Sequence, residues 1–141
     1  MVNQVELHPF FAQEGALRLM REYGVVPEAW GPFAEGRKDM FTNPVLTQIG
    51  EKYGKTAAQT ALRFLLQSDV VVIPKSTHKD RMQQNFDLFD FTLTADDMAA
   101  IEALGGDVEG CLQRYFHMPV LWGRDGKAPD YFVLVGGLLT K

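Results

Sequence analysis

The sequence has few of the features that mark secreted or membrane-bound proteins. It contains a single cysteine, Cys111, so no disulfide can form within the chain. A reducing compartment fits, because structural disulfides belong mainly to oxidising compartments. Met1 is followed by Val-Asn-Gln, without the basic start and apolar run of a signal peptide, and no apolar run approaches the length of a membrane span. We therefore expect a cytoplasmic protein.

An excess of positive charge is also missing. The formal net charge is -4, which argues against nucleic acid or an anionic membrane as a partner. No internal repeat or low-complexity tract is present. The 141 residues are enough for one domain with a real core.

The sequence does contain alternating strand and helix patterns. Strands are predicted at residues 2–7, 25–30 and 70–74, and Pro27 weakens the second because it cannot donate a ladder hydrogen bond. A helix is predicted at residues 13–23, ended by Gly24. Three later helices begin at polar caps: Asn43 before Pro44, Thr56 with Gln59, and Thr94 with Asp97. The order β-α-β-(α)-α-β-α-α implies parallel strands with helical crossovers.

Helical spacing also predicts which side chains are buried. The predicted inner faces are Ala16, Leu19, Met20 and Tyr23; Val45, Ile49 and Tyr53; Ala58, Ala61, Leu62 and Leu65; and Met82, Phe86 and Phe89. Beyond Gly106 the period is lost, and we expect an irregular tail.

Residues 73–85, IPKSTHKDRMQQN, gather groups that suit an anion. The apolar run 70–73 predicts a buried strand, and a helix follows with Thr77 as its expected N-cap and Asp80 as its capping-box partner. Lys75 and Ser76 would then lie between the strand end and the helix N-terminus, where unpaired N–H groups and the helix dipole favour negative charge. Arg81 adds a cation in the first turn. The alternative is a strand followed by a solvated helix with ordinary surface charges.

This stretch resembles the C-terminal signature of the aldo-keto reductases. The shared pattern is an aliphatic residue, Pro-Lys-Ser, four residues, Arg, two residues and Gln-Asn. The resemblance implies that Lys75, Ser76 and Arg81 hold the 2′-phosphate of NADPH, and that the Gln84-Asn85 pair contacts its adenine. By position, Thr77 and His78 would lie beside the phosphate.

Two earlier stretches extend the resemblance. Residues 3–9, NQVELHP, resemble the sixth strand of the family's barrel, which implies that Gln4 contacts the nicotinamide carboxamide. Residues 28–36, EAWGPFAEG, resemble the end of the seventh strand and its loop. Trp30 would stack on the nicotinamide ring, and the backbones of Gly31 and Phe33 would face the pyrophosphate. From the residues alone, Gln4 could equally be a polar strand end and Trp30 a core residue.

The resemblance covers residues 2–104 and implies an α/β fold, a partial (β/α)8 TIM barrel of about three parallel strands with crossover helices. Residues 1–104 would be the C-terminal part of an NADP-dependent oxidoreductase domain, and residues 105–141 a tail outside the family pattern. Pro27 and the tail depart from that pattern, as does Asp69, which replaces a turn glycine.

The residues that carry the family's catalysis have no match here. The resemblance implies a Tyr that protonates the carbonyl oxygen, supported by a Lys, an Asp and a His, all from strands that precede the match to Gln4. Such residue types recur in the tail without a spacing that indicates a site: Tyr115, His117, Lys127 and Tyr131. We therefore expect no catalytic residue and no metal site in the chain.

The leading hypothesis is the NADP(H)-binding portion of a reductase that acts on aldehydes or ketones. One alternative is a non-catalytic partial barrel that binds a nucleotide or self-associates through open sheet edges. Another is a truncated product without function.

Overall fold

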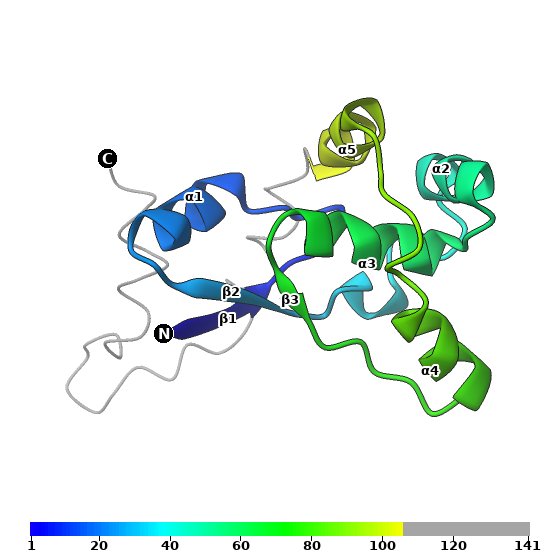
Figure 1. The fold of residues 1–141 in the computed structure, drawn as a ribbon, viewed down its shortest axis with the longest axis horizontal. Coiled ribbons are helices and arrows are strands. Elements are labelled where there is room, and N and C mark those ends of the chain that lie inside the picture. The colour runs from blue at the N-terminus through cyan, green and yellow to red at the C-terminus, as the bar shows by residue number, and fades with distance from the viewer. Residues whose placement is uncertain (106–141) are drawn as a thin grey trace. The chain divides into compact units, whose positions relative to one another are not determined.

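The computed structural model describes residues 1–105, in which strands and helices alternate along the chain (Figure 1). One parallel sheet has the strand order β1-β2-β3, with β1 (Val2–Glu6), β2 (Val26–Trp30) and β3 (Val71–Val72). The helices are α1 (Glu14–Glu22), α2 (Pro44–Tyr53), α3 (Ala57–Gln67), α4 (Lys79–Phe86) and α5 (Ala95–Glu102), with short 3-10 helices at Ala34–Gly36 and Ala103–Gly105. The predicted element order is confirmed. Predictions for the tail, including Cys111, Tyr115, His117, Lys127 and Tyr131, lie outside the described residues.

The two faces of the sheet differ in what covers them. Val5, Ala29 and Val72 are register partners across the three strands. All three pack in or against the hydrophobic core, to which α1 and α3 also contribute (Figure 1). Their neighbours in sequence point to the opposite face, because strand side chains alternate. On that face Val26 and Val71 are 43% and 44% exposed, so none of residues 1–105 covers it fully.

Pro27 is accommodated in the central strand because its missing N–H interrupts no ladder bond. The pairing of β2 with β3 begins at Glu28, one residue after Pro27. On the other side, the Val26 N–H donates to the Met1 carbonyl oxygen at 2.9 Å. Since N–H directions alternate along a strand, the nitrogen of Pro27 faces the side where pairing has not yet begun.

The third strand is shorter and more exposed than predicted. Residues 70–74 were expected to form a buried strand, yet only Val71 and Val72 pair, and Ile73 is 48% exposed. The reason is that, within residues 1–105, β3 pairs with β2 alone and therefore forms an edge of the sheet.

The predicted helix boundaries are confirmed where local side chains define them. The Asn43 side chain accepts hydrogen bonds from the Val45 and Leu46 N–H groups. Capping boxes form at Thr56 with Gln59 and at Thr94 with Asp97. Gly54 ends α2 in the left-handed region, with φ 66°.

The predicted inner faces are only partly correct. In α1 the buried residues are Leu17 and Met20, whereas Tyr23 is 73% exposed because it caps the end of the helix. In α2, Leu46 is fully buried although the predicted stripe omits it. Ala61, Leu62 and Leu65 in α3 are buried as predicted.

The prediction of a buried face on α4 is wrong. None of its residues is buried, Met82 is 43% exposed and Phe86 81% exposed, and Phe89, just beyond the helix, is 75% exposed. The spacing identifies an apolar face, but no element within residues 1–105 covers it. An apolar groove of about 640 Å³ lies between this face and β3.

Candidate cofactor site

The predicted site residues lie at or near the carboxyl ends of the strands. All three strands are parallel, so their carboxyl ends lie at the same end of the sheet. Gln4 lies two residues before the end of β1, Trp30 ends β2, and Lys75 follows β3 by three residues. Ligands bind at the carboxyl end of the strands in open α/β sheets and in (β/α)8 barrels.

Gln4 and Glu28 form a direct contact on the open face of the sheet. They are register partners in β1 and β2, and the Gln4 Nε2 atom donates to the Glu28 Oε1 atom at 2.5 Å. Trp30 lies two residues beyond Glu28, hence on the same face. The three side chains place an amide, a carboxylate and a half-buried ring on one face of the sheet.

The chain after Trp30 turns sharply. Gly31 has φ 63°, a conformation that favours glycine, and its carbonyl oxygen accepts from the Ala34 N–H at 2.8 Å. Phe33 is half-buried, and its ring centroid lies 5.5 Å from that of Phe41. The predicted pyrophosphate contacts thus belong to a defined turn at the carboxyl end of β2.

The link from β3 to α4 differs from the prediction. Thr77 is not the N-cap: the helix begins at Lys79, and its N-cap residue, His78, makes no side-chain capping bond. The capping box with Asp80 is therefore also wrong. The Ser76 Oγ atom instead accepts from the His78 N–H at 3.1 Å, which folds the chain into a turn just before the helix.

That turn leaves the helix N-terminus available to an anion. The first intrahelical bond runs from the Met82 N–H to the His78 carbonyl at 2.9 Å, so the N–H groups of the three preceding residues have no partner in the helix. Among residues 1–105, neither Lys75 nor Arg81 forms an ion pair. Lys75, Lys79 and Arg81 outnumber the single acidic residue of the turn, Asp80.

The structure groups the predicted residues into two separate clusters. Lys75, Ser76 and Asn85 line the groove between β3 and α4, whereas Arg81, Gln84, Thr77 and His78 are exposed and do not line it. Gln4 and Trp30 form the other cluster, on β1 and β2. No hydrogen bond or ring contact joins the two clusters within residues 1–105.

The segment after α4 is fixed to α3 and to the loop before it. The Lys55 side chain is 7% exposed, and its ammonium lies 2.8 Å from the carboxylates of both Asp87 and Asp90. The hydrogen bonds that the ammonium donates to these two carboxylates raise the pKa of Lys55. The Gln67 side chain donates to the Leu93 carbonyl and accepts from the Leu93 N–H, at 3.1 and 2.7 Å. These contacts hold the C-terminal end of α4 in place.

Neither this anchoring nor the contact between Glu28 and Gln4 was predicted from the sequence. Glu28 could have been found, because Gln4 and Glu28 are both the third residue of their strands, and register pairs them. The partners of Lys55 and Gln67 are 26 to 35 residues away along the chain, beyond the reach of any local pattern.

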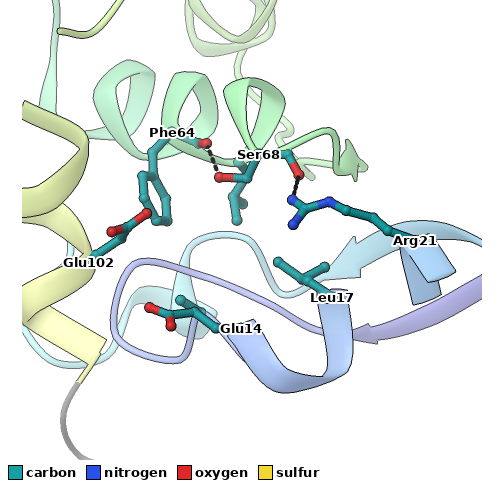
Figure 2. Close-up of a pocket in the computed structure, with 8 residues that line it drawn as sticks. Glu14, Leu17, Arg21, Phe64, Ser68 and Glu102 are labelled. Carbon is teal, nitrogen blue, oxygen red and sulfur yellow. Dashed lines mark hydrogen bonds between the residues drawn. The ribbon is translucent and has the colours of Figure 1, made fainter. Parts of the chain in front are cut away.

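A smaller pocket lies away from these residues. Figure 2 shows a pocket of about 220 Å³ lined by residues of α1, α3 and α5, including Glu14, Arg21 and Phe64. The Arg21 guanidinium donates to the Ser68 carbonyl oxygen at 2.8 Å, and the Ser68 hydroxyl donates to the Phe64 carbonyl oxygen at 2.9 Å (Figure 2). No predicted site residue lines this pocket, which we interpret as a crevice of helix packing.

Comparison with known proteins identifies related sequences and folds. The model of the aldo/keto reductase family matches residues 1–105. The chain is 45% identical over 114 residues to morphine 6-dehydrogenase of Pseudomonas putida and 46% identical over 107 residues to glyoxal reductase of Bacillus subtilis. These alignments cover 73% and 76% of this chain and 38% of each relative.

Solved structures give the same result. A mutant of Gox0644 in complex with NADPH is 39% identical to this chain, with a TM-score of 0.70 over 74% of this chain and 38% of that one. An aldo/keto reductase from Brucella melitensis is 39% identical, with a TM-score of 0.67 over 73% of this chain and 38% of that one. The chain thus spans less than two fifths of the length of these relatives.

Proposed function

The chain belongs to the aldo/keto reductase family, and from that membership we propose that residues 1–104 are the NADP(H)-binding portion of a carbonyl reductase. Its α/β fold is part of a (β/α)8 barrel: within residues 1–105 it has three parallel strands with crossover helices, where a closed barrel has eight. None of the helices in this part of the chain has the length and apolar character needed to cross a membrane. We propose a cytoplasmic location, and a separate tail at residues 105–141.

One observation carries the proposal: the N-terminus of α4 lacks a side-chain cap and is flanked by cations. Lys75 precedes the Ser76 turn, and Arg81 follows in the first turn of the helix. Phosphate suits such a place, because it can accept from free N–H groups and pair with both cations. In this proposal Lys75, Ser76 and Arg81 hold the 2′-phosphate, with Thr77 and His78 beside it.

The remaining roles follow the strand ends and α4. Gln84 and Asn85 lie three and four residues after Arg81 on α4, where their amides can reach an adenine edge. Trp30 offers its ring to the nicotinamide, Gln4 its amide to the carboxamide, and Gly31 and Phe33 their backbone to the pyrophosphate. When bound, NADPH would supply the hydride that reduces an aldehyde or ketone.

We propose that the chain by itself binds the cofactor without turnover. Hydride transfer leaves negative charge on the carbonyl oxygen, and a positioned acid must meet that charge. The residues of 1–105 that match the family all serve the cofactor, so none is assigned to the carbonyl. A truncated product without function remains the alternative if the chain binds no nucleotide.

A second candidate property, self-association, is favoured by the sheet edges and the exposed apolar surface of residues 1–105. In the part of the chain that the structure describes, β1 and β3 are the edge strands of the sheet, and edge strands offer unpaired N–H and C=O groups to other chains. Beside β3, the groove exposes Phe86 and Phe89. Contiguous exposed apolar surface of this kind favours association.

Direct binding tests the proposed function. We expect calorimetric titration of the chain to detect NADPH and to give a weaker affinity for NADH, which lacks the 2′-phosphate. We also expect adenosine 2′,5′-bisphosphate to compete with NADPH, because it carries the phosphate and the adenine without the nicotinamide. Failure of NADPH to bind at millimolar concentration would overturn the proposal.

A further inference from the structure

We propose that Glu28 is a positioning residue that fixes the orientation of the Gln4 amide and so selects a carboxamide over an acetyl group on the cofactor ring. The inference rests on the proposed function, because it concerns the same nicotinamide cluster. It goes beyond that proposal in assigning a role to Glu28, which none of the sequence motifs assigns.

The geometry places Glu28 where it can control Gln4. The two residues are register partners in adjacent parallel strands, and their side chains point to the same open face. The Gln4 Nε2 atom lies 2.5 Å from the Glu28 Oε1 atom. Glu28 is half-buried and belongs to the central strand, so its position is better fixed than that of Gln4, which is exposed on an edge strand.

The chemistry of the pair fixes which end of the amide faces outward. A glutamine amide can rotate to present either its NH2 group or its oxygen, whereas an ionised carboxylate only accepts hydrogen bonds. Glu28 therefore holds the NH2 group of Gln4, and the amide oxygen remains for another partner. Within residues 1–105 that oxygen accepts no hydrogen bond.

A free amide oxygen requires a donor on the ligand. The nicotinamide carboxamide has an NH2 group and satisfies this requirement. The acetyl group of the 3-acetylpyridine analogue has only an oxygen, which would face the Gln4 oxygen without a proton between them. A site that hydrogen-bonds a polar group discriminates against an analogue that lacks it, because the Gln4 oxygen, covered by the bound ring, would be left without a donor.

The test measures dissociation constants for NADPH and for the reduced 3-acetylpyridine analogue of NADPH, which shares the pyrophosphate, the 2′-phosphate and the adenine. The wild-type chain is expected to prefer NADPH. In Glu28→Gln either end of the Gln4 amide can face outward, and we expect the preference to fall by about threefold to tenfold, the size of one ordinary hydrogen bond. Glu51→Gln, an exposed carboxylate on α2, is the matched control and should keep the wild-type ratio.

Reversal of the charge gives a sharper result. In Glu28→Lys the ammonium only donates, so it should bind the Gln4 oxygen and turn the NH2 group outward. The preference should then move toward the acetyl analogue. Any general effect of the new charge cancels in the ratio, because both dinucleotides carry the same phosphates. In a Gln4→Ala background, changes at Glu28 should no longer alter the ratio.

The outcomes separate this inference from the proposed function. A wild-type chain that binds neither dinucleotide overturns both. The inference alone is overturned if both dinucleotides bind and the ratio of their dissociation constants is the same in wild type, Glu28→Gln and Glu28→Lys. A change of ratio that persists in the Gln4→Ala background also overturns it, because Glu28 would then act without Gln4.

Discussion

The hydroxyl oxygen of Ser76 lies 3.1 Å from the backbone nitrogen of His78 and accepts its hydrogen bond. This contact occupies the N–H group of the N-cap residue of α4 and leaves the next three N–H groups of the helix free. A turn that ends just before an uncapped helix is suited to an anion, because the anion can take the place of the missing cap. The proposed phosphate site follows from this relationship and from the cations on either side of it.

The buried carboxylate of Asp97 predicts a pH-dependent stability. Burial raises its pKa, but hydrogen bonds from Lys52, Tyr53 and Thr94 outweigh burial and hold the pKa well below its ordinary value of 3.8. A group whose pKa is lowered by folding stabilises the protein above its unfolded pKa, and this contribution is lost as pH falls below that value. Asp97→Asn should therefore reduce the free energy of unfolding at pH 7 by about 1–3 kcal/mol.

Urea denaturation at pH 7 and pH 3 checks this. The difference in the free energy of unfolding between wild type and Asp97→Asn should be smaller at pH 3, because the stabilisation from the ionised wild-type carboxylate begins to be lost there. Asp96→Asn is the matched control, since Asp96 is exposed in the same helical turn. An equal difference in the free energy of unfolding at both pH values would show that ionisation of Asp97 does not contribute to stability.

Alanine substitutions at two glycines should change the stability of the chain in opposite directions. A Cβ atom at Gly50, buried in α2, would lie 2.5 Å from the Lys55 carbonyl oxygen and 2.8 Å from the Thr60 Oγ1 atom. Gly50→Ala should destabilise the chain by about 1–3 kcal/mol, as overpacking typically does. A Cβ atom at Gly15, in α1, meets nothing within 4 Å, so Gly15→Ala should stabilise by up to about 1 kcal/mol. Thermal denaturation of both variants measures whether each is more or less stable than wild type. A change in the same direction for both would contradict the packing around Gly50.

The exposed aromatic side chains predict association of the isolated chain. Phe86 and Phe89 are 81% and 75% exposed beside the open edge of β3. The double variant Phe86→Glu, Phe89→Glu should shift the sedimentation profile toward monomer. Tyr23→Glu replaces an equally exposed aromatic at the end of α1 and should leave association unchanged. A sharp wild-type monomer peak at high concentration would refute the prediction.

Local chemistry explains which parts of the fold could be predicted. Asn43, Thr56 and Thr94 were identified correctly as caps because their partners are two or three residues away. The order of strands and helices was predictable for the same reason, since each element carries its own periodicity. Thr77 was the exception. The neighbouring Ser76 hydroxyl accepts a hydrogen bond from the His78 N–H and forms the turn, so the N-cap residue is His78.

Errors arose where burial depends on distant elements. The apolar spacing of α4 is real, yet Phe86 is exposed, because spacing cannot say whether another element covers a face. The run at residues 70–73 looks like a buried strand, but among the described residues β3 is an edge strand of the sheet. For the site, the motifs indicated candidate residues, but the link between Gln4 and Glu28 required the strand register, which no single motif contains.

The chain alone is predicted to show no meaningful carbonyl reduction. Loss of one donor that stabilises a developing oxyanion typically costs ~10²–10³ in rate, and residues 1–105 match none of the family's groups that face the carbonyl. NADPH oxidation with a panel of aldehydes and ketones, with and without a co-expressed N-terminal half of a family barrel, measures this. Turnover by the chain alone that Tyr115→Phe or Tyr131→Phe abolishes would contradict the prediction.

The most direct test of the NADP(H) site is a calorimetric titration of NADPH and NADH into wild type, Arg81→Ala and Arg18→Ala. Hydrogen bonds to charged groups contribute about 1.5–3 kcal/mol, so Arg81→Ala should weaken NADPH binding by roughly tenfold or more. Binding of NADH, which lacks the 2′-phosphate, should hardly change. Arg18→Ala removes an exposed arginine on α1 and should alter neither affinity. Equal losses of NADPH and NADH affinity in Arg81→Ala would contradict the account, because Arg81 would then not contact the 2′-phosphate.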